Sequence, residues 1–138
     1  MTAPLVHLSR AYGFSASHRL YSDRLSPERN AATFGKCANP HGHGHNYRLT
    51  VTVAGPVDPL TGFTADLSEL DGIVRRHVLD IYDHRFLNED VEDYADLVPT
   101  GENIARCLWS RLSGPLSGTL RKVTLDETRN NRFEYAGT

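Results

Sequence analysis

The sequence predicts an α+β domain in which an antiparallel sheet carries helices on one face. Three observations support this class. The first half of the chain contains two long segments whose apolar residues alternate with a period of two, which is typical of half-buried strands. The middle contains two segments with apolar residues at helical spacing, and the C-terminal part contains two short strand patterns. The length of 138 residues suits a single domain over 1–138.

The first strand is expected from Val6 to His18, where the even positions are apolar or aromatic except for Arg10. The second is expected over 43–55, where the odd positions begin with histidines and continue with tyrosine, leucine and valine. The polar segment 21–36 separates them. We expect an irregular loop there, and loops of this length in compact domains are usually functional.

A turn and a helix are expected after the second strand. The sequence DPLTG (58–62) predicts a turn, and we expect a hairpin that returns through Phe63. Asp66 should begin the first helix, because Glu69 follows three residues later as in a capping box. The apolar face of this helix comprises Leu67, Leu70, Ile73, Val74, His77, Val78 and Ile81.

The second helix should begin at Pro99-Thr100 and end at Gly114-Pro115, since its apolar residues recur at helical spacing between these signals. The chain then closes with two strands, over 120–128 and 132–137, around a turn at 129–131.

Composition narrows the class of function. The formal net charge is −2, so the chain has no basic excess for neutralising the phosphates of a nucleic acid. It contains neither an apolar run of membrane-spanning length nor a secretory signal pattern, and we therefore expect a cytoplasmic protein. The two cysteines lack CxxC spacing, which favours free thiols over a disulfide framework.

Three of the seven histidines lie within five residues, at His41, His43 and His45. His18 has the same parity as the apolar face of the first strand, and His43 and His45 have that of the second. If the strands pair antiparallel, three imidazoles meet at one end of the sheet. Three neutral nitrogens and an open position are how catalytic zinc is held, although imidazole also suits copper, iron and nickel. His41 shares this parity, so spacing does not decide which two of the cluster bind.

Cys37 follows Lys36 and precedes His41 by four residues. A nearby cation and metal would lower the pKa of this thiol and make it a usable base or nucleophile, whereas the alternative is a small buried filler. Cys107 lies inside the second amphipathic helix, where packing is the better interpretation.

Three further residues could do chemistry. Asp83 and His84 end the first helix and could form a proton relay, although a histidine there could simply interact with the helix dipole. Glu127 continues the apolar row of Val123 and Leu125. A buried carboxylate in that row needs a partner, such as a ligand with paired N–H donors, unless the strand has already reached solvent.

Together these residues resemble the family of 6-pyruvoyl-tetrahydropterin synthase and its relatives. The similarity covers nearly the whole chain, and several ordered motifs are more specific than one His-x-His pair. The matching segments are FSASHRL (14–20), FGKCANPHGHGHNY (34–47), VDPLTG (57–62), YDHRFLN (82–88), PTGENIA (99–105) and DETRNN (126–131).

The resemblance implies a role for each position. It identifies His18, His43 and His45 as zinc ligands, and Cys37 as the catalytic base that works with the Asp83–His84 relay. Glu127 would anchor the pterin ring through its N–H edge. Within PTGENIA, Thr100 and Glu102 are further ring-binding candidates. Gly101 stands where relatives commonly carry serine or threonine, so a hydroxyl contact is not expected there.

The resemblance also implies the fold, the assembly and the reaction. The family's tunnelling fold has a four-stranded antiparallel sheet and two helices, and it assembles into barrel-like trimers that stack as homohexamers. Its active sites lie at subunit interfaces, so Asp83 and His84 would reach Cys37 from a neighbouring chain. The substrate would be 7,8-dihydroneopterin triphosphate, converted by a zinc-dependent lyase into 6-pyruvoyl-tetrahydropterin, the precursor in tetrahydrobiopterin biosynthesis, without nicotinamide or flavin.

Two alternatives remain open from the sequence. Related 6-carboxy-tetrahydropterin synthases of queuosine biosynthesis usually show Cys-x3-His-x-His, and this chain contains that spacing at Cys37, His41 and His43 besides the longer spacing to His45. The following Asn46-Tyr47 and the long 21–36 segment favour the pyruvoyl type, whereas the preference for arginine over lysine hints at a bacterial source and the carboxy type. A metal- or pterin-binding module without catalysis is the alternative from a different class.

Overall fold

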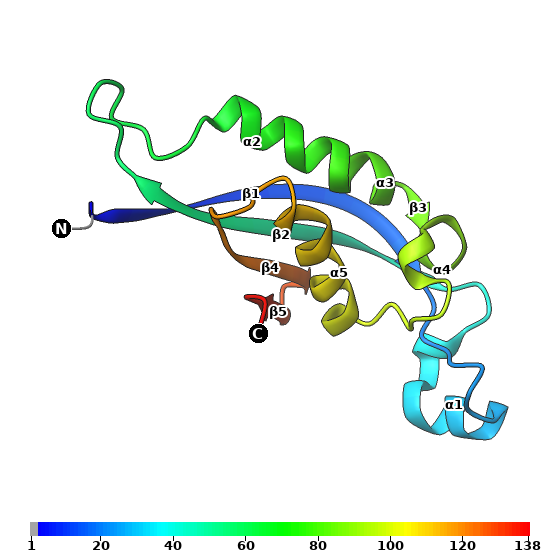
Figure 1. Cartoon of the computed structure of the whole chain (residues 1–138). Helices are drawn as coiled ribbons and strands as arrows, with labels where there is room; N and C mark the ends of the chain where they lie inside the picture. Colours follow the sequence, from blue (N-terminus) through cyan, green and yellow to red (C-terminus); the bar gives the residue numbers. More distant parts are fainter. Residues whose placement is uncertain (1–2) are drawn as a thin grey trace.

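Residues 3–138 are described by a computed structural model, in which five strands form one sheet in the order β3-β1-β2-β4-β5 (Figure 1). The four expected strands pair antiparallel, and β3 adds two residues parallel to β1. The α+β class is therefore confirmed. The strands are β1 (Leu5–His18), β2 (His43–Pro56), β3 (Arg85–Phe86), β4 (Leu120–Thr128) and β5 (Asn131–Tyr135).

The two longest strands, β1 and β2, determine where the histidines lie. They pair in unbroken register, with Leu5 opposite Pro56 at one end and His18 opposite His43 at the other. The pair forms the long curved ribbon that runs through the molecule in Figure 1. Side chains of alternate residues share a face of a sheet, so this register places His18, His43 and His45 on one face at one end.

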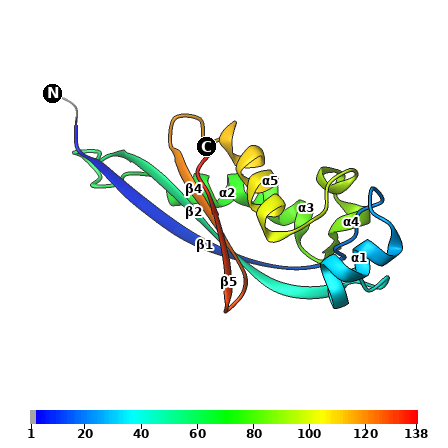
Figure 2. The same cartoon turned by 90° about the horizontal axis from the view of Figure 1, so that it is seen from below.

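The two predicted helices cover that same face of the sheet (Figure 2). The first comprises α2 (Leu67–Val74), a π-helical turn (Arg75–Leu79) and α3 (Asp80–Tyr82), and the Asp66 side chain caps it by accepting the Glu69 N–H. The second is α5 (Gly101–Ser113). Between helices and sheet lies one core, whose fully buried members include Leu49, Val51, Val74, Val78, Tyr82, Ile104, Leu108, Val123 and Leu125.

Arg10, the exception in the first strand pattern, is accommodated by the helix above it. Its guanidinium donates two hydrogen bonds to Asp71, from Nε at 2.7 Å and from Nη2 at 3.0 Å, and the Tyr12 hydroxyl donates to the same carboxylate. The charged side chain on the helix-facing side of β1 thereby has a charged partner on α2, and the two groups form a partly exposed, bidentate ion pair.

Two expectations for the connections are wrong. The 21–36 segment is not irregular throughout, because it contains α1 (Pro27–Phe34), which Ser26 caps by accepting the Arg29 N–H. No strand returns through Phe63. The Asp58 N–H donates to the Phe63 carbonyl and closes the loop, but the exposed loop has no neighbouring strand with which to pair.

The sequence also gave no indication of the short elements between the two main helices. β3 is followed by α4 (Leu87–Asp90) and by a 3₁₀ turn over Glu92–Tyr94. These elements cover the end of the sheet where the histidines lie. Within residues 3–138, no helix is both long and apolar enough to span a bilayer.

Candidate active site

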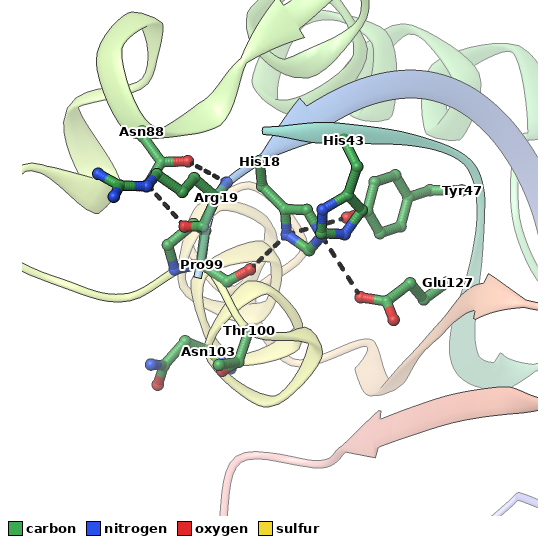
Figure 3. Close-up of polar contacts among 9 residues, drawn as sticks. All are labelled: His18, Arg19, His43, Tyr47, Asn88, Pro99, Thr100, Asn103 and Glu127. Atoms are coloured by element: carbon green, nitrogen blue, oxygen red, sulfur yellow. Dashed lines mark hydrogen bonds and ion pairs between the residues drawn. The ribbon is translucent and has the colours of Figure 1, made fainter. Parts of the chain in front are cut away.

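Three histidines converge at the end of the β1–β2 pair (Figure 3 draws two of them, His18 and His43). The Nε2 atoms of His18 and His43 are 3.0 Å apart, and one ring nitrogen from each of His18, His43 and His45 lies within 4.8 Å of the others. Nitrogens bound tetrahedrally to one zinc at about 2.0–2.1 Å lie about 3.4 Å apart. The cluster therefore has the dimensions of a three-histidine metal site.

The orientation of His18 is determined by a backbone carbonyl. Its Nδ1 lies 2.7 Å from the Pro99 carbonyl oxygen, to which it donates, and this leaves Nε2 with a lone pair directed at the cluster. The Tyr47 hydroxyl packs 3.4 Å from the same Nδ1. Burial lowers the pKa of His18 to about 4, so the imidazole is neutral at physiological pH, the state in which it can bind a metal.

His45 provides the clearest indication of an absent partner. Among the residues described, its Nε2 is a buried side-chain nitrogen without a hydrogen-bond partner, and burial also lowers the pKa of this ring. A buried polar atom left unsatisfied costs about 1–3 kcal/mol, and each such atom in a native protein calls for an explanation. A metal ion bound by the three imidazoles would satisfy this nitrogen, so the residues present fit such an ion.

His41 lies outside the cluster. Its side chain is exposed in the turn before β2, and its backbone N–H donates to the Asn39 side chain at 3.1 Å. Of the two spacings that the sequence left open, the structure brings together the one that pairs His43 with His45.

Glu127 faces the same cluster from β4. Its Oε2 atom lies 4.0 Å from His18 Nε2, and only 15% of its side chain is exposed (Figure 3). Val123 and Leu125 are fully buried on the same face, so the row has not yet reached solvent at Glu127. The register between β4 and β5 shifts between Asp126 and Thr128, and this irregularity falls at the carboxylate.

The 99–102 segment lies next to the cluster because of the Pro99 contact. Thr100 is the N-cap of α5, where its hydroxyl accepts the Asn103 N–H at 3.2 Å and retains its own proton for donation. Gly101 is buried and Glu102 is exposed. Thr100 and Glu102 thus lie at the N-terminus of α5, directly after Pro99, and their ring-binding role stays a prediction.

Asp83 and His84 form the predicted pair, at the edge of β1. His84 Nδ1 lies 3.0 Å from Asp83 Oδ1, and the same oxygen accepts the Ser15 N–H at 2.8 Å. That backbone hydrogen bond is the main reason why the pKa of Asp83 is lowered. His84 has a φ of 61°, unusual outside glycine, and its N–H donates to the Ser15 carbonyl. Its ring is 80% exposed and points away from the core.

Cys37 is not joined to these residues within the chain. It lies in the 3₁₀ helix Gly35–Ala38, half-buried, and its carbonyl accepts the Leu20 N–H at 2.8 Å. In the part of the chain that the structure describes, it forms no close cluster with Asp83 and His84 or with the three histidines. Cys107 lies in α5 beside the core, as expected, and burial raises the pKa of its thiol.

The comparison with known proteins identifies the family. The family model described as 6-pyruvoyl tetrahydropterin synthase matches residues 7–138. The chain belongs to this family. A 6-pyruvoyl tetrahydrobiopterin synthase from Pongo abelii is 48% identical over 131 residues, which cover 94% of this chain and 90% of the relative. The structure of Caenorhabditis elegans 6-pyruvoyl tetrahydropterin synthase superposes with a TM-score of 0.95 at 44% identity, covering 100% of this chain and 99% of that one.

The carboxy type is less similar. A 6-carboxy-5,6,7,8-tetrahydropterin synthase from Haemophilus influenzae is 32% identical over 121 residues, which cover 73% of this chain and 84% of the relative. Both the identity and the coverage therefore favour the pyruvoyl type among these family members.

Sequence reasoning missed the residues that hold the site segments in place. Asn88 accepts the Arg19 N–H and donates to the Arg19 carbonyl, each at 2.8 Å, while Arg19 Nε donates to the Ala38 carbonyl at 2.9 Å. Figure 3 shows Asn88 and Arg19 beside His18. Asn88 lies inside the YDHRFLN segment, so the motif contained it, but only the folded chain shows that it positions the Cys37 segment through Arg19.

Proposed function

We propose that this chain is a metal-dependent lyase that converts 7,8-dihydroneopterin triphosphate into 6-pyruvoyl-tetrahydropterin with loss of triphosphate. The principal support is the combination of three converging imidazoles, one with an unsatisfied buried nitrogen, and a half-buried carboxylate 4.0 Å from His18. The similarity to 6-pyruvoyl tetrahydrobiopterin synthases over nearly the full chain supports the same reaction.

Zinc is the ion we propose, held by His18, His43 and His45. Three neutral imidazoles and one open position are typical of catalytic zinc, and the bound ion would polarise the side-chain hydroxyls of the substrate. The chain's contribution is to keep these imidazoles neutral and oriented. Burial and the Pro99 carbonyl do so at His18.

The ring of the substrate is proposed to bind between Glu127 and the Thr100–Glu102 segment. The Glu127 carboxylate can accept two parallel N–H bonds from the amino-pyrimidine edge of a pterin, which explains why an acid continues an apolar row. The Thr100 hydroxyl remains available as a donor. This arrangement would orient the substrate side chain toward the three histidines.

We assign proton transfer to Cys37, Asp83 and His84. Asp83 holds the His84 ring through Nδ1, so Nε2 remains free to give or take a proton. The exposure of this ring is consistent with a partner on another subunit. Cys37 would then remove a proton from the substrate side chain while a neighbouring chain supplies the relay. Because the pterin ring of the substrate is reduced while the substrate's own side chain is oxidised, the reaction requires no external nicotinamide or flavin.

The assembly we propose is a homohexamer made of two trimers. Along β1, only Ala16 and Ser17 are paired on the side away from β2, and β5 ends the sheet on the other side. Two open edges of this kind can join copies into a closed barrel. Sedimentation of the purified protein tests this, with a monomer at micromolar concentration as the contradicting result.

Product identification is the decisive test of the reaction. Purified enzyme supplied with zinc and 7,8-dihydroneopterin triphosphate should release triphosphate and 6-pyruvoyl-tetrahydropterin, identified by mass spectrometry. The carboxy product is the second candidate, because the Haemophilus influenzae relative belongs to the same family. If substrate binds but no product of either kind forms, the lyase assignment is wrong and a binding module is left. If product forms but Cys37→Ala and His84→Ala retain full turnover, the proton-transfer roles of these two residues are wrong.

A further inference from the structure

Gly101 begins helix α5 within the proposed ring-binding segment, and an aromatic ring from β5 occupies the space that a side chain at 101 would take. A Cβ atom built on Gly101 would lie 2.1 Å from Phe133 Cε2 and 2.4 Å from both Cδ2 and Cζ. These separations are far below van der Waals contact. Residue 101 is therefore glycine because Phe133 leaves no room for anything larger.

The position of Phe133 connects the two parts of the proposed pterin pocket. On β5 it pairs with Leu125 of β4, which precedes Glu127 by two residues on the same face. Its ring packs against the N-terminus of α5 at Gly101, the residue between Thr100 and Glu102 in the sequence. The residue is half-buried and packs against the edge of the core. Phe133 thus packs against the helix terminus proposed to bind the pterin ring, and it lies on the strand next to the one that carries Glu127.

The chemistry of such a neighbour differs from that of a hydroxyl side chain. A serine or threonine at 101 would offer one hydrogen bond, whereas a phenyl group offers a flat apolar surface to a planar heterocycle. Contacts between aromatic rings contribute about 0.5–1.5 kcal/mol beyond the area that they bury. The absence of a side chain at 101 and the phenyl ring at 133 are therefore sterically coupled.

We propose that Phe133 forms an apolar wall of the pterin pocket, in the place of a side chain at residue 101, and that Gly101 and Phe133 are a matched pair. This inference rests on the proposed function, because it assumes that a pterin ring binds between Glu127 and Thr100. It adds a substrate-binding residue to that site, from the edge strand of the sheet.

The test compares Phe133→Val with Tyr135→Val as a matched control. Tyr135 lies two residues further along β5 and packs against Trp109 of α5, with ring centroids 5.8 Å apart. Both changes remove an aromatic ring between β5 and α5, but only Phe133→Val alters the contact with Gly101. The probe is 7,8-dihydroneopterin, whose binding to the zinc-loaded protein is followed by fluorescence, together with kcat and KM for the triphosphate.

Phe133→Val should weaken binding of 7,8-dihydroneopterin by about 3- to 10-fold and raise KM by a similar factor. The value of kcat should change by less than about twofold, because uniform binding is lost rather than transition-state stabilisation. Tyr135→Val should lower the melting temperature while leaving binding and KM unchanged. Phe133→Tyr, which keeps the ring, should bind like the wild type.

A double-mutant cycle tests the pairing. Gly101→Thr should displace the ring and weaken binding, whereas Gly101→Thr combined with Phe133→Val should recover most of the lost affinity, since the new side chain fills the vacated space. Additive losses would overturn the pairing. Wild-type affinity in Phe133→Val would overturn the wall while leaving the lyase assignment intact. Failure of the wild type itself to bind 7,8-dihydroneopterin would instead refute the proposed function, and the wall with it.

Discussion

Replacing His45 and His41 separately by alanine provides the sharpest test of the proposed metal site. His45 offers a buried nitrogen without a partner, whereas His41 is exposed outside the cluster. Changes to groups that merely support a ligand commonly cost 10- to 100-fold in metal affinity, so loss of a ligand should cost at least about 100-fold. We expect this loss for His45→Ala and none for His41→Ala.

The expected change in thermal stability follows from this factor. At a zinc concentration of about 1,000 times the wild-type dissociation constant, binding stabilises the fold by about 4.1 kcal/mol, and a 100-fold weaker site by about 1.4 kcal/mol. An unfolding entropy of about 2.1 cal/mol/K per residue converts this difference to a melting temperature about 9 °C lower for a chain of 138 residues. Without metal the two proteins should melt much closer together, because alanine removes an unsatisfied nitrogen as well as packing.

Thermal denaturation with chelator and with added zinc, at one protein concentration, measures both conditions, and elemental analysis gives the zinc bound per chain. Loss of zinc from His41→Ala with retention of zinc in His45→Ala would refute the assignment of the ligands. Equal zinc-dependent stabilisation of wild type and His45→Ala would also refute it.

Three further predictions concern protonation and the proposed catalytic groups. In metal-free protein the pKa of His18 is lowered from 6.5 to about 4, so at pH values between the two the unfolded chain binds a proton that the folded chain does not. The free energy of unfolding should therefore fall as pH falls, by about 2 kcal/mol between pH 7.5 and pH 5. In urea titrations, His18→Gln should remove this part of the pH dependence. Glu127→Gln should raise KM for the triphosphate by at least about 10-fold, because an uncharged amide replaces the carboxylate that accepts the two hydrogen bonds. An unchanged KM in steady-state assays would contradict binding of the pterin ring at Glu127. Cys37→Ala should lower kcat by about 10²- to 10⁴-fold with zinc content unchanged, while Cys107→Ala should retain wild-type turnover; similar rates for the two variants would argue against a proton-transfer role for Cys37.

The sequence predicts the histidine cluster well because strand pairing constrains it strongly. A slip of one residue between β1 and β2 would transfer every core side chain to the wrong face, so the apolar rows that include Leu49 and Val51 determine the register. Once that register holds, His18 must lie opposite His43. Parity alone could not exclude His41, because it says nothing about where β2 begins. The strand begins at His43, after a turn at Gly42 that has a φ of 72°.

The contacts that depend on tertiary packing could not be predicted in the same way. The Pro99 carbonyl meets His18 across 81 positions of sequence, and a backbone oxygen leaves no mark in the residue pattern. The helix α1 was missed for a related reason. Its polar composition indicates a loop, yet the buried Asn30 side chain accepts the Ser22 N–H and donates to the Ser22 carbonyl, so a folded segment replaces an irregular one.

Asp83 and His84 illustrate why one chain shows only part of the proposed site. Two hydrogen bonds join this pair to Ser15: the Asp83 carboxylate accepts the Ser15 N–H, and the His84 backbone N–H donates to the Ser15 carbonyl. His84 adopts a left-handed conformation that costs about 1 kcal/mol or more outside glycine. Such a conformation persists only where the surroundings enforce it, yet the ring that it presents is largely exposed. A strained backbone that holds an exposed imidazole against a carboxylate is easier to explain if the ring acts on something outside its own chain. The proposed active site shared between subunits would present the ring in this way, and it would account for the separation of Cys37 from Asp83 and His84 within one chain.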